Sequence, residues 1–168
     1  MHMKNILPIL TLTTLAAAAS AQAAAPAGLS YNRLGLGYAR SSGVDGYALT
    51  ASALIGGSNF LVEAATTVGG DAGNGDDGVS LGYVFKNVAL GADATVSVGS
   101  NETYGLNVRK DLGSNIEAAV SYTRVASANV WGIELAYNVS KQIQLAVGYD
   151  DSSVLAKGIT SLAVRYNF

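Results

Sequence analysis

The 168-residue chain contains no cysteine, and its only histidine, His2, stands next to the N-terminus. Without cysteine the chain has no disulfide, no thiolate nucleophile and no thiolate metal ligand. Histidine is the most frequent general base and zinc ligand, so a chain that carries it only at position 2 has few means of acid–base or zinc chemistry. We therefore expect no enzymatic activity, no cofactor and no metal site.

Charge is also scarce, because only 13% of the residues are charged and the formal net charge is −2. Nucleic acid is not an expected partner, since binding to it needs a basic surface that neutralises phosphates. The acidic pairs Asp76–Asp77 and Asp150–Asp151 fall in expected outer loops, which do not hold two carboxylates at the fixed separation that catalysis requires. Residues 71–78, DAGNGDDG, alternate acids and amides as a calcium loop does but lack its closing glutamate, so we expect a solvated loop.

A long apolar run occurs only near the N-terminus. Residues 1–23 have a lysine near their start, an apolar run over 6–19 and a small-residue end, Ala21-Gln22-Ala23. This order is typical of a secretory signal peptide, and the run is too short for a membrane-spanning helix. We expect cleavage after Ala23, which leaves residues 24–168 as one domain.

The rest of the chain alternates apolar and small or polar residues with a period of two. Residues 88–98, VALGADATVSV, are an example. A period of two places alternate side chains on opposite faces of a β-strand. Clusters of Gly, Asn, Asp and Ser separate the segments and predict tight hairpins, which make neighbouring strands antiparallel. The expected strands are 30–40, 47–55, 60–69, 79–85, 88–98, 103–111, 116–125, 130–139, 143–150 and 159–168.

This pattern predicts an all-β, antiparallel, up-and-down barrel of ten strands, with eight as the alternative because the sixth strand has no sharp end. The apolar face of the strands carries no charge. The opposite face carries seven charged residues among Gly, Ala, Ser and Thr: Arg33, Glu63, Asp93, Arg109, Glu117, Glu134 and Arg165. A water-facing surface is usually about a quarter to a third charged. So few charges favour a transmembrane barrel whose apolar face contacts lipid and whose small polar face lines a narrow lumen.

The aromatic residues support a membrane barrel because they fall near strand ends. If the mature N-terminus starts in the periplasm, one set lies at the outer ends: Tyr38, Tyr47, Tyr104, Tyr122, Trp131 and Tyr149. A second set lies at the inner, periplasmic ends: Phe60, Tyr83, Phe85, Tyr137, Tyr166 and Phe168, with Tyr31 beside them on the opposite parity. Two aromatic belts are typical of proteins that span a bilayer. We also expect the inner turns to be short and three of the five outer loops to be longer.

The final residues, SLAVRYNF, alternate up to a terminal phenylalanine and resemble the closing strand of bacterial outer-membrane barrels. The opening, LSYNRLGLGYARSSGVDGYAL, resembles the first hairpin of small outer-membrane β-barrel proteins of the porin-like or OmpA-barrel-like kind. The resemblance implies location in the bacterial outer membrane. It also implies that Tyr166 and Phe168 belong to the signal that the outer-membrane assembly machinery reads.

Two interpretations of the seven inward charges stay open. They form a salt-bridge network that plugs the lumen, or they line a water-filled path and set its selectivity. Barrels of about eight strands are filled by their own side chains, but the many Gly and Ala residues on this lumen face leave room for water. We therefore predict an outer-membrane barrel that is structural or forms a narrow pore for ions and very small solutes.

Closure leaves no edge strand to pair, so we expect a monomer surrounded by outer-membrane lipid and lipopolysaccharide. The alternative function is surface interaction, in which the acidic outer loops contact lipopolysaccharide or another cell.

Overall fold

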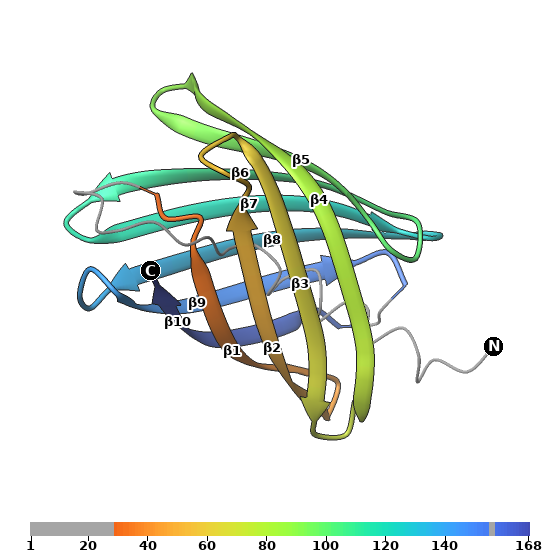
Figure 1. Ribbon diagram of the computed structural model, residues 1–168. Helices are drawn as coiled ribbons and strands as arrows, with labels where there is room; N and C mark the ends of the chain where they lie inside the picture. The colour runs from red at the N-terminus through yellow and green to blue at the C-terminus, as the bar shows by residue number, and fades with distance from the viewer. Residues whose placement is uncertain (1–28, 155–156) are drawn as a thin grey trace.

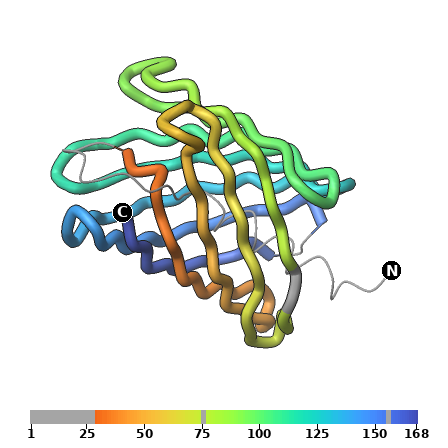
Figure 2. The backbone as a smooth tube through the Cα atoms, viewed as in Figure 1, coloured from red at the N-terminus to blue at the C-terminus, as the bar shows by residue number. Residues whose placement is uncertain are grey.

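The computed structural model describes residues 29–154 and 157–168. The expected signal peptide, residues 1–23, lies outside them. The strands are β1 (Arg33–Ser41), β2 (Val44–Leu54), β3 (Phe60–Gly69), β4 (Asn74–Ala89), β5 (Ala92–Gly99), β6 (Thr103–Gly113), β7 (Ile116–Val125), β8 (Ala128–Asn138), β9 (Ile143–Ser152) and β10 (Ile159–Asn167). They form one closed barrel in which each strand is antiparallel to both neighbours, as the views in Figures 1 and 2 show.

Closure is made by β1 and β10, which pair over eight residues from Arg33↔Asn167 to Arg40↔Thr160. Every other strand pairs with the strands before and after it in sequence. The ten-strand prediction is therefore confirmed, and the eight-strand alternative is wrong. A closed barrel satisfies the backbone hydrogen bonds of every strand between neighbours, which is the condition for placing a β-sheet in lipid.

Among the residues that the structure describes, no helix is long and apolar enough to cross a membrane.

Burial alternates along the strands, and it does so with the apolar residues outside. In β10 the side chains of Leu162 and Val164 are exposed, whereas those of Ala163 and Arg165, which alternate with them, are buried. The prediction that the apolar face points outward is confirmed. Because this arrangement buries charge and exposes leucine and valine, it fits a barrel whose surroundings are lipid.

Aromatic side chains gather at the two ends of the barrel on its outer surface. The inner end is the end that carries the C-terminus and the turns between β2 and β3, β4 and β5, β6 and β7, and β8 and β9. Rings are in contact at both ends, some between neighbouring strands and some along the same stretch of chain. The pairs at the outer end are Tyr38–Tyr47 and Tyr122–Trp131, and those at the inner end are Phe60–Tyr83, Tyr83–Phe85 and Tyr166–Phe168.

The outer connections are shorter than expected. Strands β1 and β2 are joined by Ser42 and Gly43 alone, whose φ angles of 52° and 86° are those of a tight hairpin turn. The predicted contrast between short inner turns and long outer loops is therefore wrong. Two residues with positive φ suffice to reverse the chain, and the flanking polar residues continue the strands.

Strand β4 also differs from the prediction, because it takes in most of the expected loop 71–78 and continues through an irregular pairing with β5. Its turn is formed by Leu90 and Gly91, at φ 51° and 76°, so the strand predicted over 88–98 begins at Ala92 instead. The acidic pairs are likewise in strands rather than loops. Asp76–Asp77 falls within β4, and Asp150–Asp151 falls within β9.

Candidate functional site

The structure places all seven predicted charged residues on the inner face of the barrel. Five of them are buried: Arg33, Glu63, Arg109, Glu117 and Arg165. Asp93 and Glu134 are partly exposed. The sequence pattern thus correctly predicted which charged residues face the interior. The contacts among these residues determine whether the interior is open or constricted.

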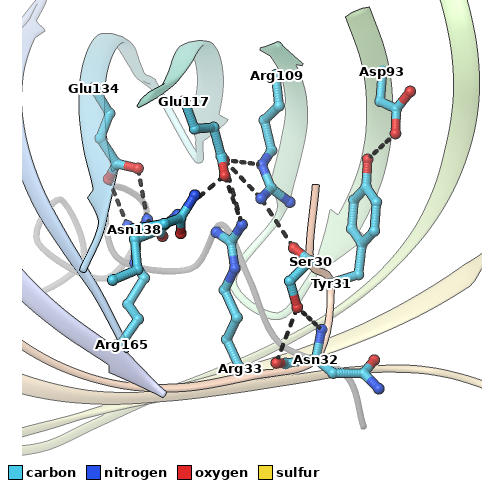
Figure 3. Close-up of polar contacts among 11 residues, drawn as sticks. Ser30, Tyr31, Asn32, Arg33, Asp93, Arg109, Glu117, Glu134, Asn138 and Arg165 are labelled. Atoms are coloured by element: carbon cyan, nitrogen blue, oxygen red, sulfur yellow. Dashed lines mark hydrogen bonds and ion pairs between the residues drawn. The ribbon is translucent and has the colours of Figure 1, made fainter. Parts of the chain in front are cut away.

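Glu117 is the centre of the interior network (Figure 3). Its side chain, on β7, is only 3% exposed. Its carboxylate accepts hydrogen bonds from Arg33 Nη2 at 2.9 Å, Arg109 Nε at 2.7 Å and Gln144 Nε2 at 3.1 Å. One buried carboxylate therefore serves two buried guanidinium groups, and such charge-assisted bonds are the strong ones.

The contact between Arg33 and Glu117 crosses the interior. Their strands, β1 and β7, are separated by β10, β9 and β8 on one side and by β2 to β6 on the other. Two side chains that meet from nearly opposite walls obstruct the space between them. The inner half of the barrel is therefore constricted by a salt-bridge network.

Arg165 extends this network toward β8. Its two terminal nitrogens bind both oxygens of Glu134, at 2.7 Å and 2.5 Å. Gln144 joins the two parts, because its amide oxygen accepts from Arg165 at 3.3 Å while its nitrogen donates to Glu117. Gln144 was not among the predicted site residues, although its parity on the ninth strand placed it on the inner face.

Arg109 is the direct cross-strand partner of Asp93, but of the two acids Asp93 and Glu117 it hydrogen-bonds Glu117. Asp93 instead accepts a 2.6 Å hydrogen bond from the hydroxyl of Tyr31. The other Arg109 contact is a 2.9 Å bond from Nη2 to the carbonyl of Ser30. Both partners belong to the segment before β1, which the sequence analysis assigned in part to the first strand.

The segment 29–32 therefore lies inside the barrel at its inner end. Tyr31 is 5% exposed and packs with Leu61 and Val84, and the Arg109 guanidinium lies 4.8 Å from the centre of its ring. Burial raises the pKa of the Tyr31 phenol, so the hydroxyl stays protonated and donates to Asp93. Its parity, opposite to that of the other aromatic residues, was the sequence signal for this placement.

Replacing Tyr31 by alanine is expected to widen the inner end. The substitution removes the ring, its hydrogen bond to Asp93 and its contact with the Arg109 guanidinium. Ion flux through the reconstituted protein should rise above that of the wild type. Tyr137→Ala is the control, because Tyr137 stands on the outer surface. Equal fluxes for Tyr31→Ala and the wild type would show that segment 29–32 does not limit the passage.

The wall farther from the inner end has a repeated pairing of glycine with a hydroxyl residue. A Cβ added to the glycine would collide with the hydroxyl oxygen of its cross-strand partner, so that hydroxyl lies flat over the glycine. In this wall the pairs are Gly105–Ser97, Gly132–Ser121 and Gly148–Ser161. A fourth pair, Gly35–Thr50, lies nearer the inner end, where Gly35 is opposite Arg165. Ser97, Asn107 and Ser121 are partly exposed on this inner face. The wall is thus lined by hydroxyl and amide residues, some of which are partly exposed.

Two further findings concern residues singled out in the sequence. Tyr166 and Phe168 are exposed on the outer surface and stack with ring centres 6.1 Å apart. Asp150, expected in an outer loop, is a buried residue of β9 whose side chain faces the interior. Within residues 29–154 and 157–168, no group of three or more His, Cys, Asp or Glu residues is arranged to hold a metal ion.

No known family model matches the sequence, and no curated protein is similar to it. Solved structures are similar in fold. The KdgM porin aligns with a TM-score of 0.52 at 16% identity, over 81% of this chain and 99% of that chain. The KdgM porin in complex with disordered oligogalacturonate aligns over the same shares with a TM-score of 0.54 at 15% identity. The chain is therefore a small closed β-barrel that shares the fold of the KdgM porin.

Proposed function

We propose that the protein is an integral outer-membrane barrel that forms a narrow path for ions and very small solutes. The observation that carries this proposal is the contrast between the two parts of the interior. One part is lined by partly exposed polar groups, including Ser97, Asn107 and Ser121. The other is constricted by charged groups that meet across the barrel. A polar wall followed by a charged constriction is the arrangement of a selective passage.

The constriction explains why the path is narrow. A solute that passes the constriction must pass or displace the contact of Arg33 with Glu117, which bridges part of the space between nearly opposite walls. Water and small ions can exchange with such groups by rearranging side chains, whereas a larger solute would break the network. Ten strands also enclose far less space than the sixteen or more of general porins.

Location in the outer membrane is supported by the lipid-type outer surface and by the fold shared with the KdgM porin. We propose that residues 1–23 are a signal peptide that directs export of the chain. We also propose that Tyr166 and Phe168 belong to the signal that the outer-membrane assembly machinery reads. We also propose that the barrel is a monomer in contact with outer-membrane lipid and lipopolysaccharide. Surface interaction through the outer loops stays a prediction.

The assembly role predicts a large loss of protein from the outer membrane when both terminal aromatic residues are replaced. Tyr166→Ala with Phe168→Ala should lower the amount of folded barrel in membrane fractions, because the stacked pair at the end of β10 is removed. Phe85→Ala is the control, since Phe85 is an exposed inner-end aromatic residue of another strand. Equal losses in the two variants would indicate a general effect of the aromatic belt and no special role of the terminus.

Liposome flux tests the proposed path directly. Purified protein, folded as judged by heat-modifiable gel mobility, is reconstituted into liposomes loaded with ions or with neutral solutes of increasing size. We expect ions and solutes of amino-acid size to leave the liposomes and disaccharides to be retained. Release of disaccharides at the rate of ions would contradict a narrow path. Retention of the ions and of all the neutral solutes would contradict a path through the barrel.

A further inference from the structure

Asp150 is a buried acid to which the interior network gives no partner. It stands near the outer end of β9, where its residue is only 3% exposed. Among the described residues, none donates a hydrogen bond to its carboxylate or forms an ion pair with it. The nearby acid Glu134 is bonded twice to Arg165, and the other two buried arginines are bonded to Glu117.

The carboxylate lies over a glycine, next to a hydroxyl oxygen. Gly132 of β8 is the direct cross-strand partner of both Asp150 and Ser121. A Cβ at Gly132 would collide with Asp150 Oδ1 and with Ser121 Oγ, so both oxygens occupy the room that the missing side chain leaves. The other neighbour, Ile159 of β10, is apolar and buried. Two oxygens thus converge at one point of the interior wall.

The charged form of such an acid is costly, because burial removes most of its hydration and no described residue donates a hydrogen bond in exchange. The cost is relieved when the carboxylate binds a proton or a cation. Alkali and alkaline-earth cations take oxygen ligands from carboxylates and other oxygen groups. Ser121, which is partly exposed, supplies a second oxygen beside the carboxylate.

We propose that Asp150 and Ser121 form a cation-binding site in the outer half of the path, and that this site makes the path prefer small cations such as K⁺ over anions. The proposal rests on the function proposed above. Gly132 is part of the site, because any side chain there would displace the carboxylate.

The test compares two adjacent aspartates. Asp151 follows Asp150 on β9 but is exposed, so Asp151→Asn makes the same chemical change on the other face of the strand. Reversal potentials across planar bilayers in a KCl gradient give the ratio of K⁺ to Cl⁻ permeability. We expect Asp150→Asn and Gly132→Ala to lower this ratio several-fold and Asp151→Asn to leave it unchanged.

A second readout needs no conduction. When K⁺ is replaced by the bulky cation N-methylglucamine, Asp150 should take up a proton, and the infrared band of a protonated carboxyl should appear. The band should be present in the wild type and in Asp151→Asn but absent in Asp150→Asn. Heat-modifiable mobility confirms folding of each variant.

The two readouts separate failure of the site from failure of the path. If Asp150→Asn conducts with the selectivity of the wild type and no cation-dependent band is seen, the cation site is overturned and the proposed path is still supported. A band that only Asp150→Asn removes, in a protein that carries no current, would support the site and overturn the path. Absence of both signals would overturn both proposals.

Discussion

Replacing Glu117 by alanine is expected to lower the free energy of unfolding by about 3–5 kcal/mol, the usual cost of removing one partner from a buried ion pair. The physical reason is that Glu117 is the hydrogen-bonded counter-ion of both Arg33 and Arg109. Its loss leaves two guanidinium groups facing each other in the interior. Reversible unfolding in urea, with the barrel folded into lipid vesicles, measures the change.

Two controls make the Glu117 result specific. Glu102→Ala removes an exposed carboxylate in an outer turn and should change stability little. The triple variant Arg33→Met, Arg109→Met, Glu117→Leu removes the whole charged group and should recover much of the stability, because apolar replacement of a buried ionic cluster is often neutral or stabilising. A loss below about 1 kcal/mol for Glu117→Ala would show that water hydrates these charges and that the network is no constriction.

Val120→Arg is expected to lower the free energy of unfolding by about 2–4 kcal/mol, the cost of arginine near the midplane of a bilayer on the lipid face of a barrel. Val120 stands in the middle of β7, points outward and is 53% exposed. The same urea titration in vesicles measures the loss. Glu102→Arg, in the outer turn, is the matched control and should be nearly neutral.

The effect of Val120→Arg on stability shows whether lipid or water surrounds the outer surface of the barrel. In water an arginine at a half-exposed position costs little, because its charge is hydrated. In lipid the charge must reach the interface or deform the bilayer. An unchanged stability for Val120→Arg in vesicles would therefore contradict the membrane-spanning assignment.

The strands and their faces could be predicted from the sequence because alternation is a local property of the β-conformation. The tenth strand, predicted over 159–168, is β10 over Ile159–Asn167, with Leu162 and Val164 outside and Arg165 inside as the pattern indicated. Strand ends were predicted less well. Polar residues such as Asp45 were counted as loop, although a two-residue turn next to them was enough to reverse the chain.

The partners of the interior charges could not be predicted in the same way. Which side chains meet across a barrel depends on its closure and on the relative shift of its strands, and neither is visible in local alternation. Hence the contact of Arg33 with Glu117 was not foreseen. The opposite parity of Tyr31 was visible in the sequence, but its contacts were not predicted because the residues before β1 leave the sheet and enter the interior. The inward position of Asp150 was not predicted because the pair Asp150–Asp151 was assigned to an outer loop, although the alternation of the ninth strand places Asp150 on the inner face.

Single-channel recording in planar bilayers tests the central claim, that the barrel interior is a narrow path, most directly. With heat-modifiable mobility as proof of folding, the wild type should give small discrete current steps, and Tyr31→Ala should give larger steps. Silent bilayers with both proteins, each shown to be folded and inserted, would contradict the account and would mean that the salt-bridge network closes the barrel completely.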